Sequence, residues 1–165
     1  MKVDNIEKLF VNELKDLYSA EKQITHALPK MAKAATTEEL RTAFETHLRE
    51  THGQIKRLDR VFEILRKPGA GKNCQGMKGL LEEGSETMEE TEKGGLRDAA
   101  MIGAAQRVEH YEIAAYGTAR TMADLLGQKE IAQLLQETLD EEGNTDKKLT
   151  QIASRVNREA QRQAA

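Results

Sequence analysis

The sequence predicts an all-α fold, a single domain in which long helices pack as a bundle. Good helix formers dominate the 165 residues, which include only two prolines and no tryptophan. Apolar residues recur at steps of three and four over segments of about 30 residues, the spacing of one buried helix face. The whole length, residues 1–165, fits one domain.

Composition argues against several functional classes. A net charge of −3 gives no overall attraction to nucleic acid or anionic membranes, and basic residues gather only at Arg155, Arg158 and Arg162, in a tail expected to be frayed. Cys74 is the only cysteine, which excludes an intrachain disulfide and favours a reducing compartment. The absence of an apolar signal core and of a membrane-length apolar run predicts a cytoplasmic protein. No phosphate loop, nucleophile elbow or zinc pattern is present.

Two predicted hairpins account for most of the chain. The first joins helices at 4–35 and 37–66, and Pro68 and Gly69 end it. The second joins helices at 96–126 and 129–157, with Gly127 at the turn. A shorter helix at 74–92 lies on the long connection between them. This pattern predicts a ferritin-like four-helix bundle of two antiparallel helical hairpins, with a fifth short helix in the crossover.

A weak internal repeat supports the two-hairpin interpretation. Placing Glu21 over Glu112 without gaps also places Glu50 over Glu141. Most other pairs differ, so the repeat is suggestive only.

Glutamates stand on or beside the predicted buried faces of all four long helices. A single glutamate at such a position usually reaches water from the flank of the stripe, and acidic residues are common in this chain. A carboxylate on every long helix instead indicates a shared core site. The candidates are Glu21 in the first helix, Glu50 beside His47 in the second, Glu109 and Glu112 in the fourth, and Glu141 in the last.

Such a cluster needs compensating charge. Two like charges about 4 Å apart repel by roughly 4 kcal/mol at an effective dielectric constant of 20. The carboxyls must therefore take up protons or be neutralised by divalent metal ions. Two divalent ions would balance four carboxylates.

Four motifs resemble those of the bacterial YciF/YciE family of stress-induced proteins. They span Tyr18–Gln23, His47–Gln54, Val108–Tyr116 and Glu137–Glu142, in this order. The resemblance implies a ferritin-like fold, a homodimer, and kinship with rubrerythrin and other di-iron carboxylate proteins.

By this resemblance, Glu21 and Glu112 (or Glu109) are terminal ligands, and Glu50 and Glu141 are bridging ligands. Di-iron bundles carry a histidine three residues after each bridging glutamate. Here those positions hold Gly53 and Asn144, and His47 is the only histidine on the relevant face. His52 and His110 are expected at the surface. A site without two imidazoles is oxygen-rich and favours hard, exchangeable cations.

Two hypotheses follow. In the first, the protein is a metal-binding stress protein that holds one or two iron or manganese ions, with oxygen or peroxide chemistry as one use, and Tyr18 and Tyr116 are candidate hydrogen-bond donors to the site. In the second, it is a metal-free structural or protein-interaction protein with a degenerate site, which the missing histidines favour. The sequence identifies neither a catalytic residue nor a substrate.

Overall fold

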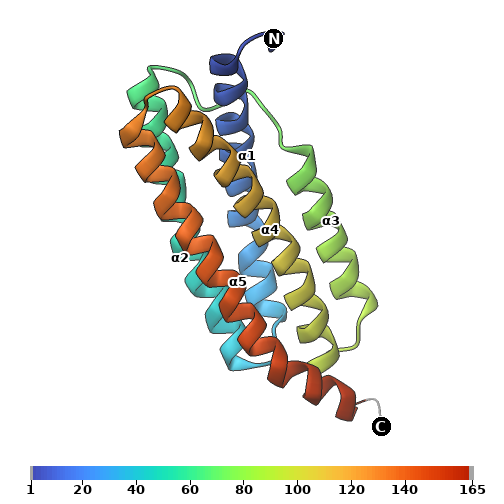
Figure 1. Ribbon diagram of the computed structural model, residues 1–165. Helices are drawn as coiled ribbons and strands as arrows, with labels where there is room; N and C mark the ends of the chain where they lie inside the picture. The colour runs from blue at the N-terminus through green and yellow to red at the C-terminus, as the bar shows by residue number, and fades with distance from the viewer. Residues whose placement is uncertain (1, 164–165) are drawn as a thin grey trace.

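Five helices form nearly all of the chain in a computed structural model that describes residues 2–163. They are α1 (Ile6–Ala34), α2 (Glu38–Leu65), α3 (Gln75–Glu90), α4 (Gly95–Leu125) and α5 (Lys129–Gln163). No strand occurs in this part of the chain. The four long helices pack as a bundle, and α3 lies outside it against α4 and α1 (Figure 1). The predicted all-α bundle with a short helix in the crossover is confirmed.

The direction of the helices explains the crossover. Helices α2 and α4 run toward the same end of the bundle, whereas α1 and α5 run toward the other (Figure 1). The chain must therefore return along the bundle between α2 and α4, and α3 provides this return. As a result, the four main contacts between long helices are all antiparallel: α1 with α2, α4 with α5, α1 with α4, and α2 with α5.

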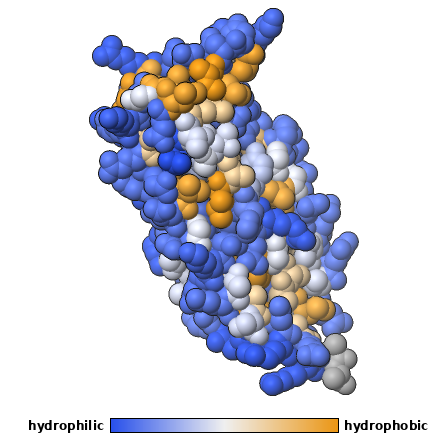
Figure 2. Space-filling model, in the orientation of Figure 1, coloured by the Kyte–Doolittle hydropathy of each residue, from blue (hydrophilic) through white to orange (hydrophobic). Residues whose placement is uncertain are grey.

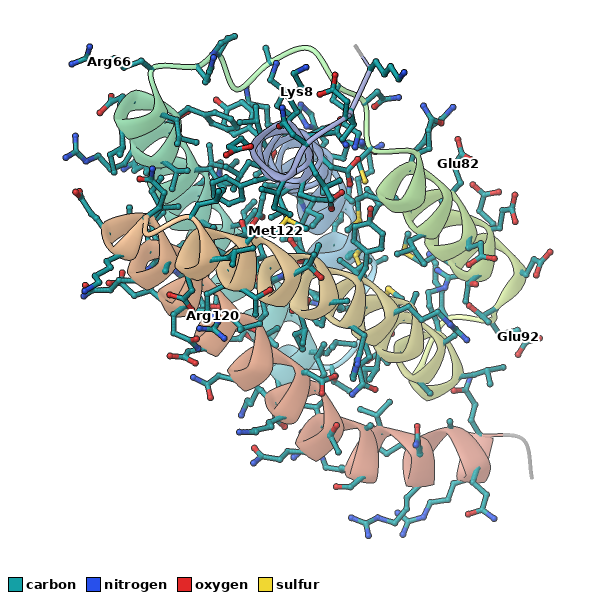
Figure 3. All side chains as sticks on the ribbon, turned by 45° about the horizontal axis from the view of Figure 1, so that its top comes forward. Lys8, Arg66, Glu82, Glu92, Arg120 and Met122 are labelled. Carbon is teal, nitrogen blue, oxygen red and sulfur yellow. The ribbon has the colours of Figure 1, made fainter. Side chains whose placement is uncertain are left out.

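Helix α3 is amphipathic and covers the groove between α1 and α4. Met77 is fully buried, and Leu80, Leu81 and Met88 pack against the same core. On the opposite side, Glu82 points away from the bundle, as Figure 3 shows. This arrangement places α3 outside the four-helix core, as the sequence predicts.

Two apolar cores fill the bundle, separated by a polar layer near its middle. One core includes Ile24, Phe44 and Leu149, and the other includes Leu17 and Leu58. On each long helix, buried polar residues stand between the two sets. They are Glu21 on α1, His47, Thr51 and Gln54 on α2, Glu109 and Glu112 on α4, and Thr138 and Glu142 on α5.

The last helix is longer than the sequence predicts. It continues to Gln163, beyond the expected end near Asn157, and the tail is therefore not frayed there. Val156 is fully buried, and the Gln163 side-chain amide donates to the Lys93 carbonyl oxygen at 2.9 Å. Among residues 2–163, no helix has both the length and the apolar content that a membrane crossing requires.

A buried carboxylate ties the two hairpins together at one end of the bundle. Asp98, in the first turn of α4, is fully buried. Its two oxygens accept hydrogen bonds from the backbone N–H groups of Thr36, at 2.8 Å, and Thr37, at 2.7 Å. Thr37 has no side-chain cap of its own on α2. Asp98 therefore satisfies donors at the start of α2 from the opposite hairpin.

Replacement of Asp98 by alanine should lower the free energy of unfolding by roughly 2–4 kcal/mol, because two backbone donors lose a charged acceptor. Urea unfolding measures this change. The matched control is Asp124→Ala, which removes an exposed ion pair with Arg120 and should cost less than about 1 kcal/mol. Equal losses in the two variants would contradict the role assigned to Asp98.

Candidate metal centre

The polar layer contains five titratable side chains that face one another. They come from all four long helices and are shielded from solvent, His47 being the most exposed at 4%. Each residue lies on the buried face of its helix, at steps of three and four from buried apolar residues. Packing of those apolar residues therefore orients the polar side chain toward the core. The five are Glu21, His47, Glu109, Glu112 and Glu142.

Four of these side chains converge closely enough to share a cation. His47, Glu109, Glu112 and Glu142 each offer a ligand atom, and these atoms all lie within 4.8 Å of one another. His47 Nε2 lies 3.0 Å from Glu109 Oε1. The two atoms are close enough for an ion pair, but their geometry is not that of a hydrogen bond. The spacing suits one or two divalent ions surrounded by oxygen and a single imidazole nitrogen.

Many oxygen atoms in this layer have no hydrogen-bond donor. Within the described residues, both carboxyl oxygens of Glu112 and of Glu142, and one each of Glu21 and Glu109, are buried without a partner. Buried polar atoms are normally hydrogen-bonded, and the exceptions require an explanation. A bound cation would satisfy these lone pairs, so the residues present fit a metal.

Glu21 is held at the edge of this cluster by Tyr116. The Tyr116 hydroxyl donates a short hydrogen bond to Glu21 Oε1, and both side chains are fully buried. Burial, together with the nearby Glu21, raises the pKa of Tyr116 well above its usual value, so the hydroxyl keeps its proton. Tyr18, the other candidate donor, instead donates to Asp59 at 2.7 Å and does not reach the layer.

Burial changes which of these groups carry charge. It raises the pKa of Glu21 to about 7 and those of Glu112 and Glu142 well above the usual range, and neighbouring carboxylates add to the rise for Glu112 and Glu142. For His47, burial favours the neutral ring, but the adjacent Glu109 outweighs it and raises the pKa well above 6.5.

The same pairing acts on Glu109 in the opposite direction. Burial would raise its pKa, but His47 holds it below the usual value. These shifts favour, in the metal-free layer near neutral pH, a Glu109–His47 ion pair beside protonated carboxyl groups on Glu112 and Glu142. Protons and divalent cations compete for the same oxygens.

Two predicted site residues do not enter the layer. Glu141 binds Arg57 across α2 and α5, with Oε1 2.5 Å from Nη2 and Oε2 2.9 Å from Nη1, and it also accepts from Gln54 at 3.1 Å. Glu50 borders the layer: its side chain is 36% exposed, and Oε2 lies 3.9 Å from His47 Nδ1. The prediction that Glu50 and Glu141 meet Glu21 and Glu112 in the core is wrong.

The residue missed by the sequence interpretation is Glu142, and the helical spacing contained the signal. The buried positions of α5 run through Leu135, Thr138, Glu142 and Leu149, at steps of three, four and seven. Glu141 lies one residue off this stripe. In the internal repeat, Glu142 falls over Thr51, which is buried on α2 but offers no carboxylate. The site therefore lacks a carboxylate ligand at the equivalent position of the first hairpin.

The positions at which di-iron bundles carry histidines also shift by one residue, because they are counted from Thr51 and Glu142 in place of Glu50 and Glu141. Three residues after Thr51 and Glu142 stand Gln54 and Thr145, so the conclusion that both downstream histidines are missing is unchanged. His52 is exposed, and His110 is exposed beside Asp146, with Nε2 3.2 Å from Oδ1. His47 is the one histidine in the layer.

Comparison with known proteins assigns the chain to a family. It is 51% identical to Protein YciF of Escherichia coli (strain K12), over 99% of this chain and 100% of that one. The crystal structure of the E. coli stress protein YciF superposes with a TM-score of 0.91 over 94% of this chain and 99% of that chain. YcfI from Rhodopseudomonas palustris, a candidate structural protein, is 43% identical with a TM-score of 0.87, over 90% and 95% of the two chains.

A more distant relative shares the fold of this chain, and its low sequence identity supports no conclusion beyond the fold. A protein from Xanthomonas campestris pv. campestris shares 22% identity and a TM-score of 0.74, over 92% of this chain and 93% of that one. A family model described as a domain of unknown function (DUF892) matches residues 5–162. These matches confirm the resemblance carried by the four motifs: the chain belongs to the DUF892 family, together with E. coli YciF.

Proposed function

We propose that this protein is a stress-response protein whose polar layer binds one or two divalent metal ions, iron or manganese. The observation that carries the proposal is the set of buried carboxyl oxygens without donors on Glu21, Glu109, Glu112 and Glu142. A bundle that needed only stability would place apolar side chains there, because unsatisfied buried polar atoms cost free energy. The association with stress comes from the description of the relative YciF.

The donor set determines what kind of ion fits. Glu109, Glu112, Glu142 and His47 would hold the metal, and Glu21, fixed by Tyr116, would complete the oxygen-rich side. Four ionised carboxylates balance the charge of two divalent ions, and oxygen donors favour hard cations. When bound, iron would supply redox chemistry toward oxygen or peroxide. The protein residues would orient the ligands and exclude bulk water from the layer.

A metal-free structural role is the second candidate, and specific observations favour it. Glu141 is neutralised by Arg57, and Thr51, Gln54 and Thr145 stand where di-iron bundles carry glutamate and histidines. Protons can balance the remaining carboxyls, as the raised pKa values of Glu112 and Glu142 indicate. The description of the relative YcfI points the same way.

Adjacent glutamates on α5 provide a matched test of metal binding. Glu142→Gln should weaken the affinity for manganese(II) or iron(II). Loss of a residue that only supports a metal ligand lowers metal affinity by roughly 10–100-fold, and loss of a direct ligand should cost at least as much. Glu141→Gln should leave the affinity unchanged, because Glu141 binds Arg57 and not the layer. Anaerobic calorimetric titration measures both. No binding to the wild type, or equal losses in the two variants, would support the metal-free alternative.

The metal-free protein should become less stable as pH rises from 5 to 8. The folded-state pKa values of Glu21, Glu112 and Glu142 lie above 4.5, and that of His47 lies above 6.5, so the folded state holds more protons across this window. Each extra proton lowers the free energy of unfolding by about 1.4 kcal/mol per pH unit. Glu109, with a lowered pKa, contributes an opposite slope only in more acidic solution.

Melting temperatures of chelator-treated protein check this dependence. The double variant Glu112→Gln/Glu142→Gln should flatten the slope, whereas Glu141→Gln should retain it. A wild-type melting temperature that is constant or rises between pH 5 and pH 8 would be inconsistent with buried, proton-holding carboxyls.

We also propose a homodimer, which the family resemblance implies. An apolar patch supports it: Leu125 is 74% exposed, and Met122 and Leu126 are half-buried beside it. Figure 2 shows apolar residues gathered at this end of the molecule, where α4 turns into α5. Light scattering should give twice the monomer mass of 18.5 kDa, and a monomeric mass would argue against the dimer.

A further inference from the structure

Two neighbouring cavities lie beside α1 and are separate from the polar layer. The larger, of about 400 Å³, lies between α1, α3 and α4. The smaller, of about 250 Å³, lies between α1 and the loop at 69–72. Gln23 and His26 border both cavities, which therefore adjoin each other along α1. In the part of the chain that the structure describes, neither lining includes a titratable residue of the polar layer.

The larger cavity, which we call the apolar cavity, has flexible apolar walls. Met31, Met88 and Met101 line it from three different helices. Methionine is unbranched and adapts its shape to irregular apolar neighbours. Along α3 the lining extends from Lys78 to Met88, a length of about 15 Å. This length suits a flexible alkyl chain, and the volume lies within the range of pockets that hold small organic ligands.

The smaller cavity, which we call the basic cavity, is lined by two lysines, and within residues 2–163 by no aspartate or glutamate. Lys22 Nζ lies 4.3 Å from the centre of the Tyr18 ring, which holds this ammonium group beside the cavity. Lys72 Nζ lies 3.1 Å from Asp16 Oδ1 and keeps two of its three donors for a ligand. Lys22 is exposed and Lys72 is half-buried, so a ligand can reach both from solvent. Even with Asp16 counted, this wall carries net positive charge.

Charge around the apolar cavity also disfavours a cationic ligand. Its charged lining residues are Lys30, Lys78 and Glu82. Glu82 Oε1 lies 3.6 Å from Lys78 Nζ, so the one carboxylate already has a partner. An alkyl chain that fills the apolar cavity therefore brings its head group to a rim that favours an anion. The basic cavity offers the larger concentration of positive charge at one end of that rim.

We propose that the two cavities together bind a single-chain fatty acid, with its carboxylate at Lys22 and Lys72 and its alkyl chain in the apolar cavity. The chain gains free energy by leaving water, and two ammonium groups stabilise the carboxylate. Gln23 marks the boundary, where its Nε2 donates to the Cys74 carbonyl oxygen at 3.1 Å. The ligand crosses this boundary on the solvent side, beside the exposed His26. Binding requires no metal and does not depend on the proposed function.

Calorimetric titration of the full chain with sodium decanoate tests the site. One equivalent should bind. 1-Decanol and decylammonium chloride carry the same chain with a neutral or a cationic head group, and each should bind at least tenfold more weakly. Absence of decanoate binding, or equal or tighter binding of either analogue, would overturn the proposal.

Lysine variants test the position of the carboxylate. Lys22→Gln/Lys72→Gln should weaken decanoate binding at least tenfold and leave 1-decanol binding unchanged. Lys30→Gln/Lys33→Gln is the matched control, because it removes the same charge from exposed positions near the other end of α1. It should bind decanoate as the wild type does. Equal losses in the two double variants would contradict the assigned head-group site.

Two glycines of α3 test the position of the alkyl chain. Gly84 lines the apolar cavity, and a Cβ atom there would lie 3.6 Å from the Ala104 Cβ, an ordinary contact. Gly84→Leu should fill part of the cavity and weaken decanoate binding at least tenfold. Gly79 lies outside the lining, and a Cβ atom there meets nothing within 4 Å. Gly79→Leu should therefore bind as the wild type does.

Equal affinity in the two leucine variants would overturn the proposed position of the chain. Circular dichroism checks that each variant is folded. If Gly84→Leu is not, Ser85→Phe, on the exposed rim of the same cavity, takes its place with the same expected loss.

Discussion

Burial of four carboxylic acids at one level of the bundle imposes a charge balance on the rest of the protein. Glu21, Glu109, Glu112 and Glu142 cannot all be ionised without compensation, because like charges repel strongly away from water. Among residues 2–163, the layer contains one candidate cation, His47, beside Glu109, and one hydrogen-bond donor, Tyr116, which contacts Glu21. The remaining balance must come from protons or from metal ions. The same oxygens therefore determine both the pH dependence of stability and the capacity for metal.

The surrounding helices offset the free-energy cost of burying this layer and hold its side chains in place. Two apolar cores, one on each side, supply the hydrophobic free energy that offsets an unsatisfied polar layer. Arg57 and Glu141 clasp α2 to α5 beside the layer, and Asp98 links the two hairpins at the end of the bundle. The crossover helix α3 covers the outside of α1 and α4. The side chains of the polar layer are thus positioned by packed helices and not by loops.

Most of the fold could be predicted from the sequence because its signals are local. Helix starts, the Pro68–Gly69 break and the apolar stripes each depend on nearby residues, and four of the five helices end within about two residues of the expected positions. The end of α5 could not be predicted in this way. It depends on a contact between Gln163 and Lys93, far apart in the chain, and on burial of Val156.

The site was predictable only in part. Glu21, Glu109 and Glu112 interrupt regular apolar stripes, and the structure places all three in the polar layer. The repeat with Glu50 points to Glu141, yet a shift of one residue rotates a side chain by about 100° around a helix. Strict spacing from Leu135 selects Glu142. The pairing of His47 with Glu109 joins different hairpins, so no local pattern could reveal it.

Anomalous X-ray diffraction from crystals grown with manganese(II) tests the central claim most directly. The account predicts an anomalous peak in the polar layer, within coordination distance of Glu109, Glu112 and Glu142, with His47 beside it. Full-length electron density with no peak in this layer, or peaks only at exposed carboxylates such as Glu50, would contradict the assignment of the layer as a metal centre.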